Sequence, residues 1–468
     1  MQNRREFIKT LVVGGAGIAV LPGFARSASD PWQTVYPQIL SRIKPPVFPR
    51  RYFAITKFGA TSDGTSDSTS AIAAAIDACS KAGGGRVVIP AGEFLTGAVH
   101  LRSNVNLYLE KEATLKFSTD AKMYPIVRTR FEGMECMNYS PFVYAFDQTN
   151  VAITGEGTLD GQANEQHWWL WQGSARFGWK EGMPNQRAAR AKLYEMMQTA
   201  VPVEQRVFGE GSYLRPNFIQ PHRCKNVLIE GVKIVNSPMW EIHPLLSENV
   251  TVRNVWISSH GPNNDGCDPE SCKDVLIENC HFDTGDDCIA IKSGRNEDGR
   301  RVAVATENVV VRGCEMKDGH GGVTIGSEIS GGVRNVFAEN CQMDSPHLDS
   351  AVRVKNNAAR GGLLENFYFR NIAVGQVAHA LITVDFNYEE GAKGAFKPVM
   401  RNLVVSNLTS GKSKFGVDIQ GLENAPVYDL SISNSTFENV SDGNIVKNLV
   451  GAKLDNVKIN GKKIESLQ

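Results

Sequence analysis

The sequence lacks an excess of either charge and, beyond its first 21 residues, lacks any long hydrophobic run. Its 468 residues include 50 Lys and Arg against 50 Asp and Glu, so the formal charges balance. A nucleic-acid partner normally shows as a basic excess, and a membrane-spanning helix needs about 20 consecutive apolar residues. The composition therefore argues against nucleic-acid binding and against an integral membrane span in the mature chain.

The one apolar run lies at the N-terminus, from Thr10 to Leu21, and follows Arg4-Arg5-Glu6-Phe7-Ile8-Lys9. Small residues come next, and Ala25-Arg26-Ser27 offers a cleavage site. This stretch resembles a bacterial twin-arginine export signal; a Sec signal and an uncleaved anchor are the alternatives. We expect residues 1–29 to be the signal and the mature protein to be periplasmic or extracellular.

Two segments precede the repetitive part of the chain. Residues 30–50 contain five prolines, which predicts an extended arm, since prolines oppose a helix. Residues 70–79 carry apolar side chains at helical spacing and end near a Gly83-Gly84-Gly85 run, before a strand at 87–89. We expect this helix to cap an open sheet end. The glycines do not indicate a phosphate loop, because no Lys-Ser/Thr follows them.

One alternating six-residue pattern then recurs at intervals of about 22 to 36 residues. It begins with Asn, Asp or Gly, alternates apolar side chains, and ends with Asn or Gly. The copies are 226–231, 249–254, 274–279, 308–313, 335–340, 366–371, 402–407, 429–434 and 451–456, with weaker copies starting at Asn104 and Asn150. Asn and Gly tolerate the left-handed backbone of a tight corner, and stacked Asn side chains can hydrogen-bond to one another.

This repeat predicts an all-β fold, a single-stranded right-handed parallel β-helix over residues 51–468. One alternating strand cannot bury its apolar face alone, but stacked coils share a continuous core, and the hand follows the usual chirality of parallel connections. A β-propeller needs four strands per repeat, which these intervals cannot supply. Residues 161–221 interrupt the repeat and are expected to be an insertion that could close one end of a cleft.

The nine cysteines of the chain fall into two groups. Cys280, Cys314 and Cys341 follow the repeat corner, where other copies have apolar residues, so we expect an interior stack; a metal site is the alternative. Cys267 and Cys272 flank a turn and are the best candidates for a disulfide. Oxidising conditions outside the cytoplasm would permit such a bond.

The insertion contains His167-Trp168-Trp169-Leu170-Trp171 and a helix-like run near 187–197. Two interpretations of the tryptophans remain open at this point. Exposed tryptophans in a loop can stack on sugar rings, and buried ones would instead pack the loop onto the barrel.

Four charged motifs occupy successive repeats: Asn263-Asn264-Asp265, Gly285-Asp286-Asp287, Gly319-His320-Gly321 and Arg353-Val354-Lys355. Aligned on their corners, Asp265, Asp287, Gly322 and Ala351 share one register, and neighbouring coils lie roughly 4.8 Å apart. Alternation then turns five side chains to one outer face: Asp265, Asp287, His320, Arg353 and Lys355. Asp286 has the opposite parity and needs a bend at Gly285. The same register sends Asp268 inward and Ile289 outward, which is a flaw in the alignment.

Clustered carboxylates cannot all ionise cheaply, so one holds a proton. A carboxylic acid beside a carboxylate is what glycoside hydrolysis requires, because the acid protonates the leaving oxygen and the base activates water. Arg353 and Lys355 would bind an anionic sugar. A solvated acidic turn explains one Asp-Asp pair, but four motifs on successive coils favour a catalytic site.

From about Phe53 to the C-terminus the chain resembles glycoside hydrolase family 28, the polygalacturonase family of pectin-degrading β-helix enzymes. Its motifs Asn-Thr-Asp and Arg-Ile-Lys differ here at Asn264 and Val354, and the other two match. The resemblance implies a metal-free, cofactor-free, inverting reaction on pectin. It makes Asp286 the acid and His320 its support. Asp265 and Asp287 would hold the water, and Arg353, Lys355 and Asn263 would bind the substrate.

We therefore expect an exported hydrolase of α-1,4-galacturonosidic linkages, acting as a monomer on pectic oligosaccharides or polysaccharides and favouring chain ends. A rhamnogalacturonan or other pectic side-structure hydrolase of the same family is the main alternative. A Ca²⁺-dependent pectate lyase and a non-catalytic sugar-binding β-helix are further alternatives. The exchange at Asn264 is expected to alter the shape of a subsite.

Overall fold

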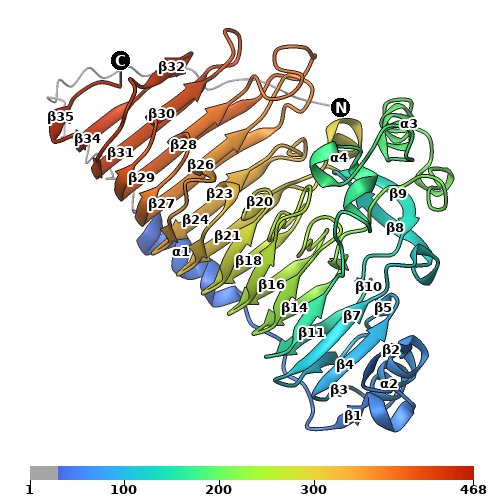
Figure 1. The fold of residues 1–468 in the computed structure, drawn as a ribbon. Coiled ribbons are helices and arrows are strands. Elements are labelled where there is room, and N and C mark those ends of the chain that lie inside the picture. The colour runs from blue at the N-terminus through green and yellow to red at the C-terminus, as the bar shows by residue number, and fades with distance from the viewer. Residues whose placement is uncertain (1–29, 468) are drawn as a thin grey trace, which may run out of the picture.

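A computed structural model of the chain describes residues 30–467. They form a right-handed parallel β-helix, whose coils stack along one axis from β1 at one end to β35 at the other (Figure 1). Among these residues, no helix is long and apolar enough to cross a membrane. The export signal predicted over 1–29 lies outside the described residues.

Each coil contributes strands to three parallel ladders. The first ladder contains β1 (Tyr52–Ala54), β3 (Gly85–Ile89), β6 (Val105–Leu109), β11 (Thr149–Gly155), β14 (Lys225–Glu230), β16 (Glu248–Arg253), β18 (Lys273–Glu278), β21 (Thr306–Arg312), β24 (Val333–Glu339), β27 (Leu363–Gln376), β29 (Val399–Lys412), β31 (Val427–Phe437), β33 (Leu449–Val450) and β34 (Lys453–Ile459). The antiparallel strand β35 (Lys462–Ile464) ends the chain beside β34.

The second ladder contains β2 (Asp63–Asp67), β4 (Gly92–Thr96), β7 (Ala113–Phe117), β12 (Thr158–Asp160), β15 (Lys233–Val235), β17 (Trp256–Ser259), β19 (His281–Thr284), β22 (Glu315–Met316) and β25 (Gln342–Met343), and it continues into the second half of β27. The third ladder contains β5 (Val99–His100), β10 (Val143–Phe146), β13 (Ile219–His222), β20 (Ile289–Ile291), β23 (Gly319–Ile325), β26 (Leu348–Lys355), β28 (Ala380–Asp385), β30 (Phe415–Gln420) and β32 (Ile445–Lys447). Single bridges at Ile242 and Cys267 link β13 to β20, so this ladder is continuous.

The first residue of the repeat builds a line of side-chain hydrogen bonds along the first ladder, made of asparagines except where Asp274 takes the place of one. Each bond runs from one Nδ2 to the Oδ1 of the preceding coil, over 2.7 to 3.2 Å. The donors are Asn150, Asn226, Asn249, Asn308, Asn335, Asn366 and Asn402. These residues have positive φ, as do the asparagines at the second corner. The predicted corners and the predicted Asn stacking are both confirmed.

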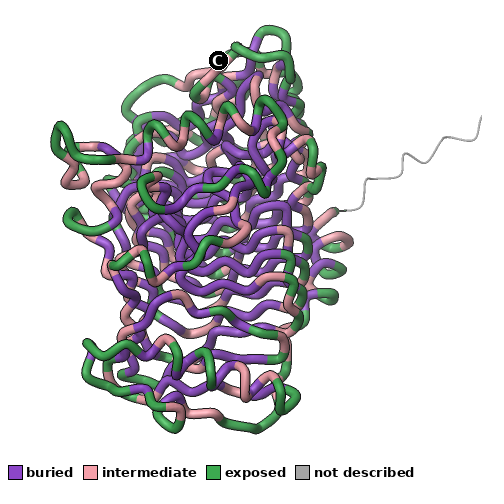
Figure 2. The backbone as a smooth tube through the Cα atoms, turned by 90° about the vertical axis from the view of Figure 1, so that its right-hand side faces the viewer, coloured by how far each residue is buried: buried purple, intermediate pink, exposed green. Residues whose placement is uncertain are grey.

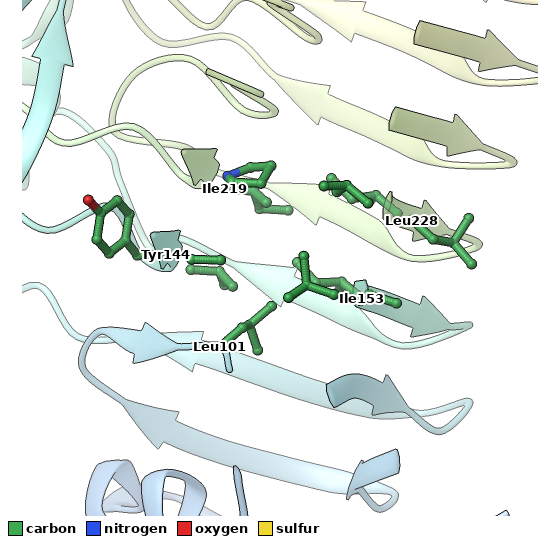
Figure 3. Close-up of a pocket in the computed structure, with 12 residues that line it drawn as sticks. Leu101, Tyr144, Ile153, Ile219 and Leu228 are labelled. Atoms are coloured by element: carbon green, nitrogen blue, oxygen red, sulfur yellow. The ribbon is translucent and has the colours of Figure 1, made fainter. Parts of the chain in front are cut away.

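The interior of the coil is one continuous apolar core, and most of the stacked strands are buried (Figure 2). Leu101, Ile153 and Ile219 point into it from neighbouring coils (Figure 3). The predicted cysteine stack belongs to this core, because Cys280, Cys314 and Cys341 are each at most 2% exposed.

The expected disulfide between Cys267 and Cys272 is wrong. All nine cysteines lie within residues 30–467, and all are buried free thiols. The backbone of Cys267 forms β-bridges with Ile242 and Ile289, on the coils before and after it. The Cys272 thiol donates to Pro244 O at 3.2 Å. Each sulfur therefore has its own place in the stack.

Two helices pack against the coil, one over its N-terminal end and one on the outside of the first ladder beside β18 and β21. The capping helix is α2 (Thr69–Lys81), and its buried face includes Ile72, Ala75 and Ile76. The expectation of an extended arm over 30–50 is wrong for its first half, because α1 spans Pro31–Arg42 with Pro37 inside it. Pro31 stands in the first turn, where its missing N–H costs nothing, and Asp30 Oδ1 accepts from Trp32 N at 3.0 Å.

Packing explains why α1 survives an internal proline, which costs about 3 kcal/mol in a helix. Its buried residues Trp32, Tyr36 and Ile39 belong to a satellite core on the outside of the first ladder, which also contains Phe337 and Tyr368. The Trp32 and Phe337 rings meet edge to face at 5.0 Å. Residues 43–49 have no regular structure.

The insertion contains the predicted helix, α3 (Arg187–Gln198). Its tryptophans favour the packing interpretation. Trp168 is 1% exposed within the main core, Trp171 packs on it with ring centroids 4.7 Å apart, and Trp169 Nε1 donates to Ser237 O at 2.8 Å. These side chains attach the insertion to the barrel.

Candidate active site

The motif side chains lie on the outer face of the third ladder, where each coil bends before its strand. At each bend two consecutive residues face the core: Gly266-Cys267, Cys288-Ile289, Gly322-Val323 and Ala351-Val352. A Cβ on Gly266 would lie 2.4 Å from Phe282, and one on Gly322 would lie 2.6 Å from Met343, so both glycines face inward. Because two consecutive residues face inward at each bend, the residue before the pair and the residue after it both lie on the outer face.

Strand pairing corrects the predicted register by one residue in two coils. The pairs are Cys267–Ile289, Ile289–Val323, Val323–Val352 and Gly321–Ser350. The positions equivalent to Asp287 are therefore Gly321 and Ser350, not Gly322 and Ala351. The predicted register assumed that side chains alternate strictly between the two faces, and the bend breaks this alternation. Asp265, Asp268 and Asp287 therefore face outward, and Ile289 faces inward.

Asp286 and His320 form a pair at the opening of the site. His320 Nδ1 lies 2.9 Å from Asp286 Oδ1, and the two side chains are 46% and 19% exposed. The predicted bend at Gly285 is present: Gly285 N donates to Ser259 O, and a Cβ there would lie 2.5 Å from Gly261 O. Close packing of this backbone therefore turns Asp286 toward His320.

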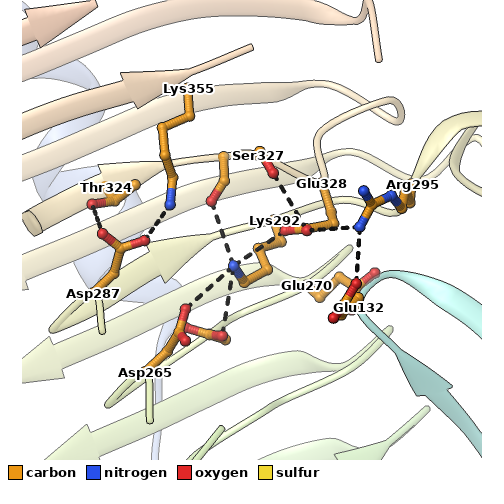
Figure 4. Close-up of polar contacts among 12 residues, drawn as sticks. Glu132, Asp265, Glu270, Asp287, Lys292, Arg295, Thr324, Ser327, Glu328 and Lys355 are labelled. Atoms are coloured by element: carbon orange, nitrogen blue, oxygen red, sulfur yellow. Dashed lines mark hydrogen bonds and ion pairs between the residues drawn. The ribbon is translucent and has the colours of Figure 1, made fainter. Parts of the chain in front are cut away.

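Asp265 and Asp287 lie deeper, on adjacent coils joined by the bond from Gly266 N to Asp287 O at 3.0 Å. Asp287 Oδ2 accepts from Lys355 Nζ at 2.5 Å, and its Oδ1 accepts from Thr324 Oγ1 at 3.0 Å (Figure 4). Each of Asp265, Asp286 and Asp287 has one oxygen within 4.8 Å of the others. The structure thus brings the three predicted carboxylates together.

Burial and neighbouring charges set the protonation of this cluster. Burial raises the pKa of Asp265 to about 8; the charge of Asp286 acts in the same direction, and Lys292 opposes it. Burial would also raise the pKa of Asp286, but the hydrogen bond and charge of His320 outweigh it and hold that pKa below its ordinary value. The same hydrogen bond raises the pKa of His320 to about 9. At neutral pH these shifts favour one proton on Asp265 and one on His320.

The predicted substrate-binding residues differ in how free they are. Arg353 Nη1 donates to His320 O at 3.0 Å and lies 3.7 Å from Asp287 Oδ1, with 19% of its side chain exposed. Lys355 is 7% exposed and committed to Asp287. The side-chain oxygen of Asn263 accepts from Arg215 Nη2 at 2.7 Å. Arg353 is therefore the more exposed of the two cations predicted to bind the substrate.

The Asn264 side chain does not line the pocket, so the expected effect on the shape of a subsite would act through the loop that it supports. It is fully buried. Its Oδ1 accepts from Ser259 Oγ and Gly261 N, both at 2.7 Å, and its Nδ2 donates to the backbone oxygens of Ser237 and Met239. The amide braces the loop that carries Asp265.

A wall of side chains closes the pocket beside the carboxylates. It is formed by the tip of the hairpin of β8 (Ile126–Phe131) and β9 (Met134–Tyr139), by α3, by the residues before α4 (Asn296–Val302) and by loop 386–394. In Figure 1, β8, β9, α3 and α4 gather on one side of the coil. We call this group the end wall.

Arg295 forms salt bridges with two separate segments of the end wall. Its Nη1 lies 3.1 Å from Glu132 Oε2 at the hairpin tip, and its Nη2 lies 3.0 Å from Glu389 Oε2. Glu132 also accepts from Arg190 Nε of α3 at 2.6 Å. The insertion therefore contributes one part of the wall. No repeat or motif in the sequence marks Glu132, Arg295 or Glu389, so none of them could be predicted from it.

Two groups among residues 30–467 could offer a metal ion three ligands: Asp265, Asp286 and Asp287, and His260, Asp283 and Asp318. Lys292, His320 and Lys355 already face the first group and oppose its charge. In the second group, His260 Nε2 lies 3.1 Å from Asp283 Oδ1. Acid–base chemistry at the first group needs only the side chains present.

Comparison with known proteins agrees with this geometry. The family model described as glycosyl hydrolases family 28 matches residues 209–456, and one described as rhamnogalacturonase A/epimerase, pectate lyase-like, matches residues 52–173. A probable polygalacturonase of Vitis vinifera is 28% identical, covering 82% of this chain and 73% of the relative. An exo-poly-alpha-D-galacturonosidase of Dickeya chrysanthemi is 30% identical, over 72% of this chain and 57% of the relative.

Among solved structures, a hyperthermoactive exopolygalacturonase from Thermotoga maritima is 48% identical, with a TM-score of 0.90. The match covers 92% of this chain and 97% of that one. The family match over residues 209–456 includes all four motifs. The chain belongs to glycosyl hydrolases family 28 and is a glycoside hydrolase.

Proposed function

We propose that the protein hydrolyses α-1,4-galacturonosidic linkages of pectin from chain ends, by an inverting acid–base mechanism. The observation that carries this proposal is the paired arrangement of the site. A His320–Asp286 pair that holds a proton faces two deeper carboxylates, Asp265 and Asp287, across less than 5 Å. The polygalacturonase relatives support the choice of substrate.

Asp286 serves as the general acid in this proposal. The His320–Asp286 pair keeps one proton at neutral pH, because the pKa of His320 is raised to about 9. As the glycosidic bond breaks, the proton stored on His320 passes to Asp286 across their hydrogen bond, and Asp286 delivers it to the leaving oxygen. A proton from solvent then restores the pair. The partial exposure of both side chains leaves this edge of the pair open to a sugar.

Asp265 and Asp287 hold the attacking water between them, and one accepts its proton. Typical inverting enzymes separate acid and base by roughly 6.5–9.5 Å, which is wider than the 4.8 Å limit of this cluster. Here two carboxylates rather than one would hold the water, so it can sit to the side of Asp286. The family resemblance supports inversion, and product stereochemistry tests it directly.

Arg353 binds the carboxylate of a galacturonate in this proposal. Its side chain is more exposed than that of Lys355, and a guanidinium can hold a carboxylate through two parallel bonds. Lys355, which is held by Asp287, contributes positive potential from below. An anionic sugar therefore suits the site better than a neutral one.

The end wall supports action on chain ends. Salt bridges join the hairpin tip, α3 and loop 386–394 beside the carboxylates, so a polymer cannot continue through this boundary unless the bridges open. The 48% identical exopolygalacturonase agrees with that choice.

Digestion of defined oligogalacturonides, labelled at the reducing end, tests the proposal. We expect galacturonate to be released stepwise and proton NMR within minutes to show the inverted anomer first. A ladder of mid-sized products would contradict exo-action, and a retained anomer would contradict the mechanism. Activity confined to branched pectic fragments would indicate a side-structure hydrolase, and products absorbing in the ultraviolet would indicate a lyase.

A further inference from the structure

Lys292 is a buried cation in the pocket that none of the four motifs includes. Only 3% of its side chain is exposed. Its Nζ lies 3.2 Å from Glu328 Oε2, 3.4 Å from Asp265 Oδ2 and 3.7 Å from Asp268 Oδ2 (Figure 4). It also lies 4.5 Å from the centre of the Trp240 ring. A long side chain held on several sides is confined to one position.

Lys292 and Lys355 occupy equivalent places two coils apart. Strand pairing aligns Ile291, Ile325 and Val354, so the residues that follow them, Lys292, Gly326 and Lys355, form one outward column. The glycine between the lysines has no side chain to separate them. Lys355 faces Asp287 at 2.5 Å, and Lys292 faces Asp265 at 3.4 Å. Each of the two deeper carboxylates therefore has its own ammonium.

The carboxylates near Lys292 have little other support. Asp265 Oδ1 and both oxygens of Asp268 accept no hydrogen bond from any residue that the structure describes. Asp265 is 3% exposed and Asp268 is fully buried, so bulk water cannot stabilise their charges. Burial raises the pKa of both, and Lys292 lowers the pKa of both. Without the ammonium, an ionised Asp265 would have no cation within salt-bridge distance among residues 30–467.

We infer that Lys292 is a positioning residue that acts through Asp265, fixing its carboxylate in place and favouring the ionised form that holds the attacking water. The inference rests on the proposed function, because it concerns the base side of the same site. Among residues 30–467, the ion pairs of Lys292 are to Asp265, Asp268 and Glu328 and not to the proposed acid, Asp286. Loss of Lys292 should therefore change when Asp265 ionises rather than how the sugar binds.

The test compares Lys292→Met, Lys292→Arg and wild type in pH profiles of kcat and KM. Lys292→Met keeps most of the apolar stem and removes the charge. We expect the acidic limb of kcat to move to higher pH by at least about one unit, because an opposite charge at this range shifts a carboxyl by one to three units. KM should change less than threefold, and Lys292→Arg should restore most of the profile. Lys412→Met, an exposed lysine of β29, is the matched control.

A folded Lys292→Met protein with the wild-type pH profile would overturn the inference and leave only a structural role. If Lys292→Met does not fold, Glu328→Gln replaces it. That change removes the nearest counter-charge of Lys292, so the acidic limb should move to lower pH, and an unmoved limb would overturn the inference. Failure of the proposed function looks different, because wild type itself would leave every pectic oligosaccharide intact. Infrared titration of the buried carboxyls in wild type and variant then decides the inference without substrate.

Discussion

The first and third ladders are built by the same stacking of coils, yet their polar side chains differ in how well they are hydrogen-bonded. On the first ladder, stacked asparagines donate to the residue one coil before, for example Asn335 to Asn308 at 3.1 Å, and the one carboxylate in the line, Asp274, accepts from Asn308 and Arg42. On the third ladder, stacking brings carboxylates together. Asp265 Oδ1 and both Asp268 oxygens find no donor among the described residues, and His320 remains 46% exposed.

This difference separates stability from chemistry within one architecture. A neutral amide both donates and accepts, so a column of amides satisfies itself. An ionised carboxylate only accepts hydrogen bonds. Stacked carboxylates therefore repel one another unless cations or bound protons neutralise their charge. The third ladder supplies Lys292, Lys355 and His320 for that purpose. Substitutions on the two ladders should therefore affect different measurements.

The largest effect on activity is expected from Asp286→Asn. The amide cannot donate an acidic proton to the leaving oxygen, so kcat should fall by about 10²–10⁴-fold, with KM and melting temperature nearly unchanged. Steady-state kinetics on a digalacturonate substrate measures it. The matched control is Asp283→Asn, three residues earlier on the second ladder, where the side chain is 31% exposed and faces His260. An Asp286→Asn enzyme that keeps a tenth of its turnover would refute the acid assignment.

His320→Asn should have the next largest effect and should reveal how the proton is stored. The pKa of His320 is raised from 6.5 to about 9 by Asp286. The pair therefore stabilises the fold fully below pH 6.5 and loses that contribution as the pH rises through about 9. Wild-type activity should decline through the same range.

Without the imidazolium, Asp286 must hold the proton alone, so the alkaline limb of kcat should move to lower pH. Turnover at pH 8 should fall by at least about tenfold. Chemical denaturation at pH 6 and pH 10 gives the stability half of the test. An alkaline limb that stays in place would show that His320 does not share the catalytic proton.

Glu132→Ala should have a smaller effect on rate but a visible one on products. Glu132 joins Arg190 and Arg295 across the end wall, and 11% of its side chain is exposed. Its loss should loosen the hairpin tip and allow longer products, while kcat on short substrates stays within about fivefold, since the carboxylates are untouched. Chromatography of early digests detects the change. Glu204→Ala, at a 69% exposed partner of Arg128, should leave the products unchanged.

The sequence was sufficient for the coil and for the set of motif residues, because both follow from periodicity. It failed where local bends override alternation. The doubled inward pair Cys288-Ile289 has no signature of its own, and a strict period of two misplaced Gly322 and Ala351 by one residue. The proline count also misjudged α1, whose packing against Phe337 could not be read from its composition.

The end wall and Lys292 could not be predicted from the sequence for a different reason. Glu132, Arg295 and Glu389 come from segments far apart in the chain and meet only in the folded coil. Lys292 follows an apolar strand that reads as core, Ile289–Ile291. One signal could have found it: the alignment of Ile291 with Val354 puts Lys292 in the column of Lys355, once the register is correct.

The smallest effect on activity is expected on the first ladder, and it makes the comparison sharpest. Asn308 donates to Asp274 at 2.9 Å, accepts from Asn335 at 3.1 Å and has φ of 61°. Asn308→Ala removes both bonds and places a residue without a local polar partner in the left-handed region, so the free energy of unfolding should fall by about 2–3 kcal/mol. The midpoint of urea denaturation measures this, and kcat and KM should not change.

The control is Asn456→Ala, at the exposed end of the line of asparagines at the second corner. It should lower the free energy of unfolding by less, because its loss leaves no buried group unpaired. If Asn308→Ala instead lowered kcat at unchanged stability, the separation between a supporting ladder and a reacting ladder would be wrong.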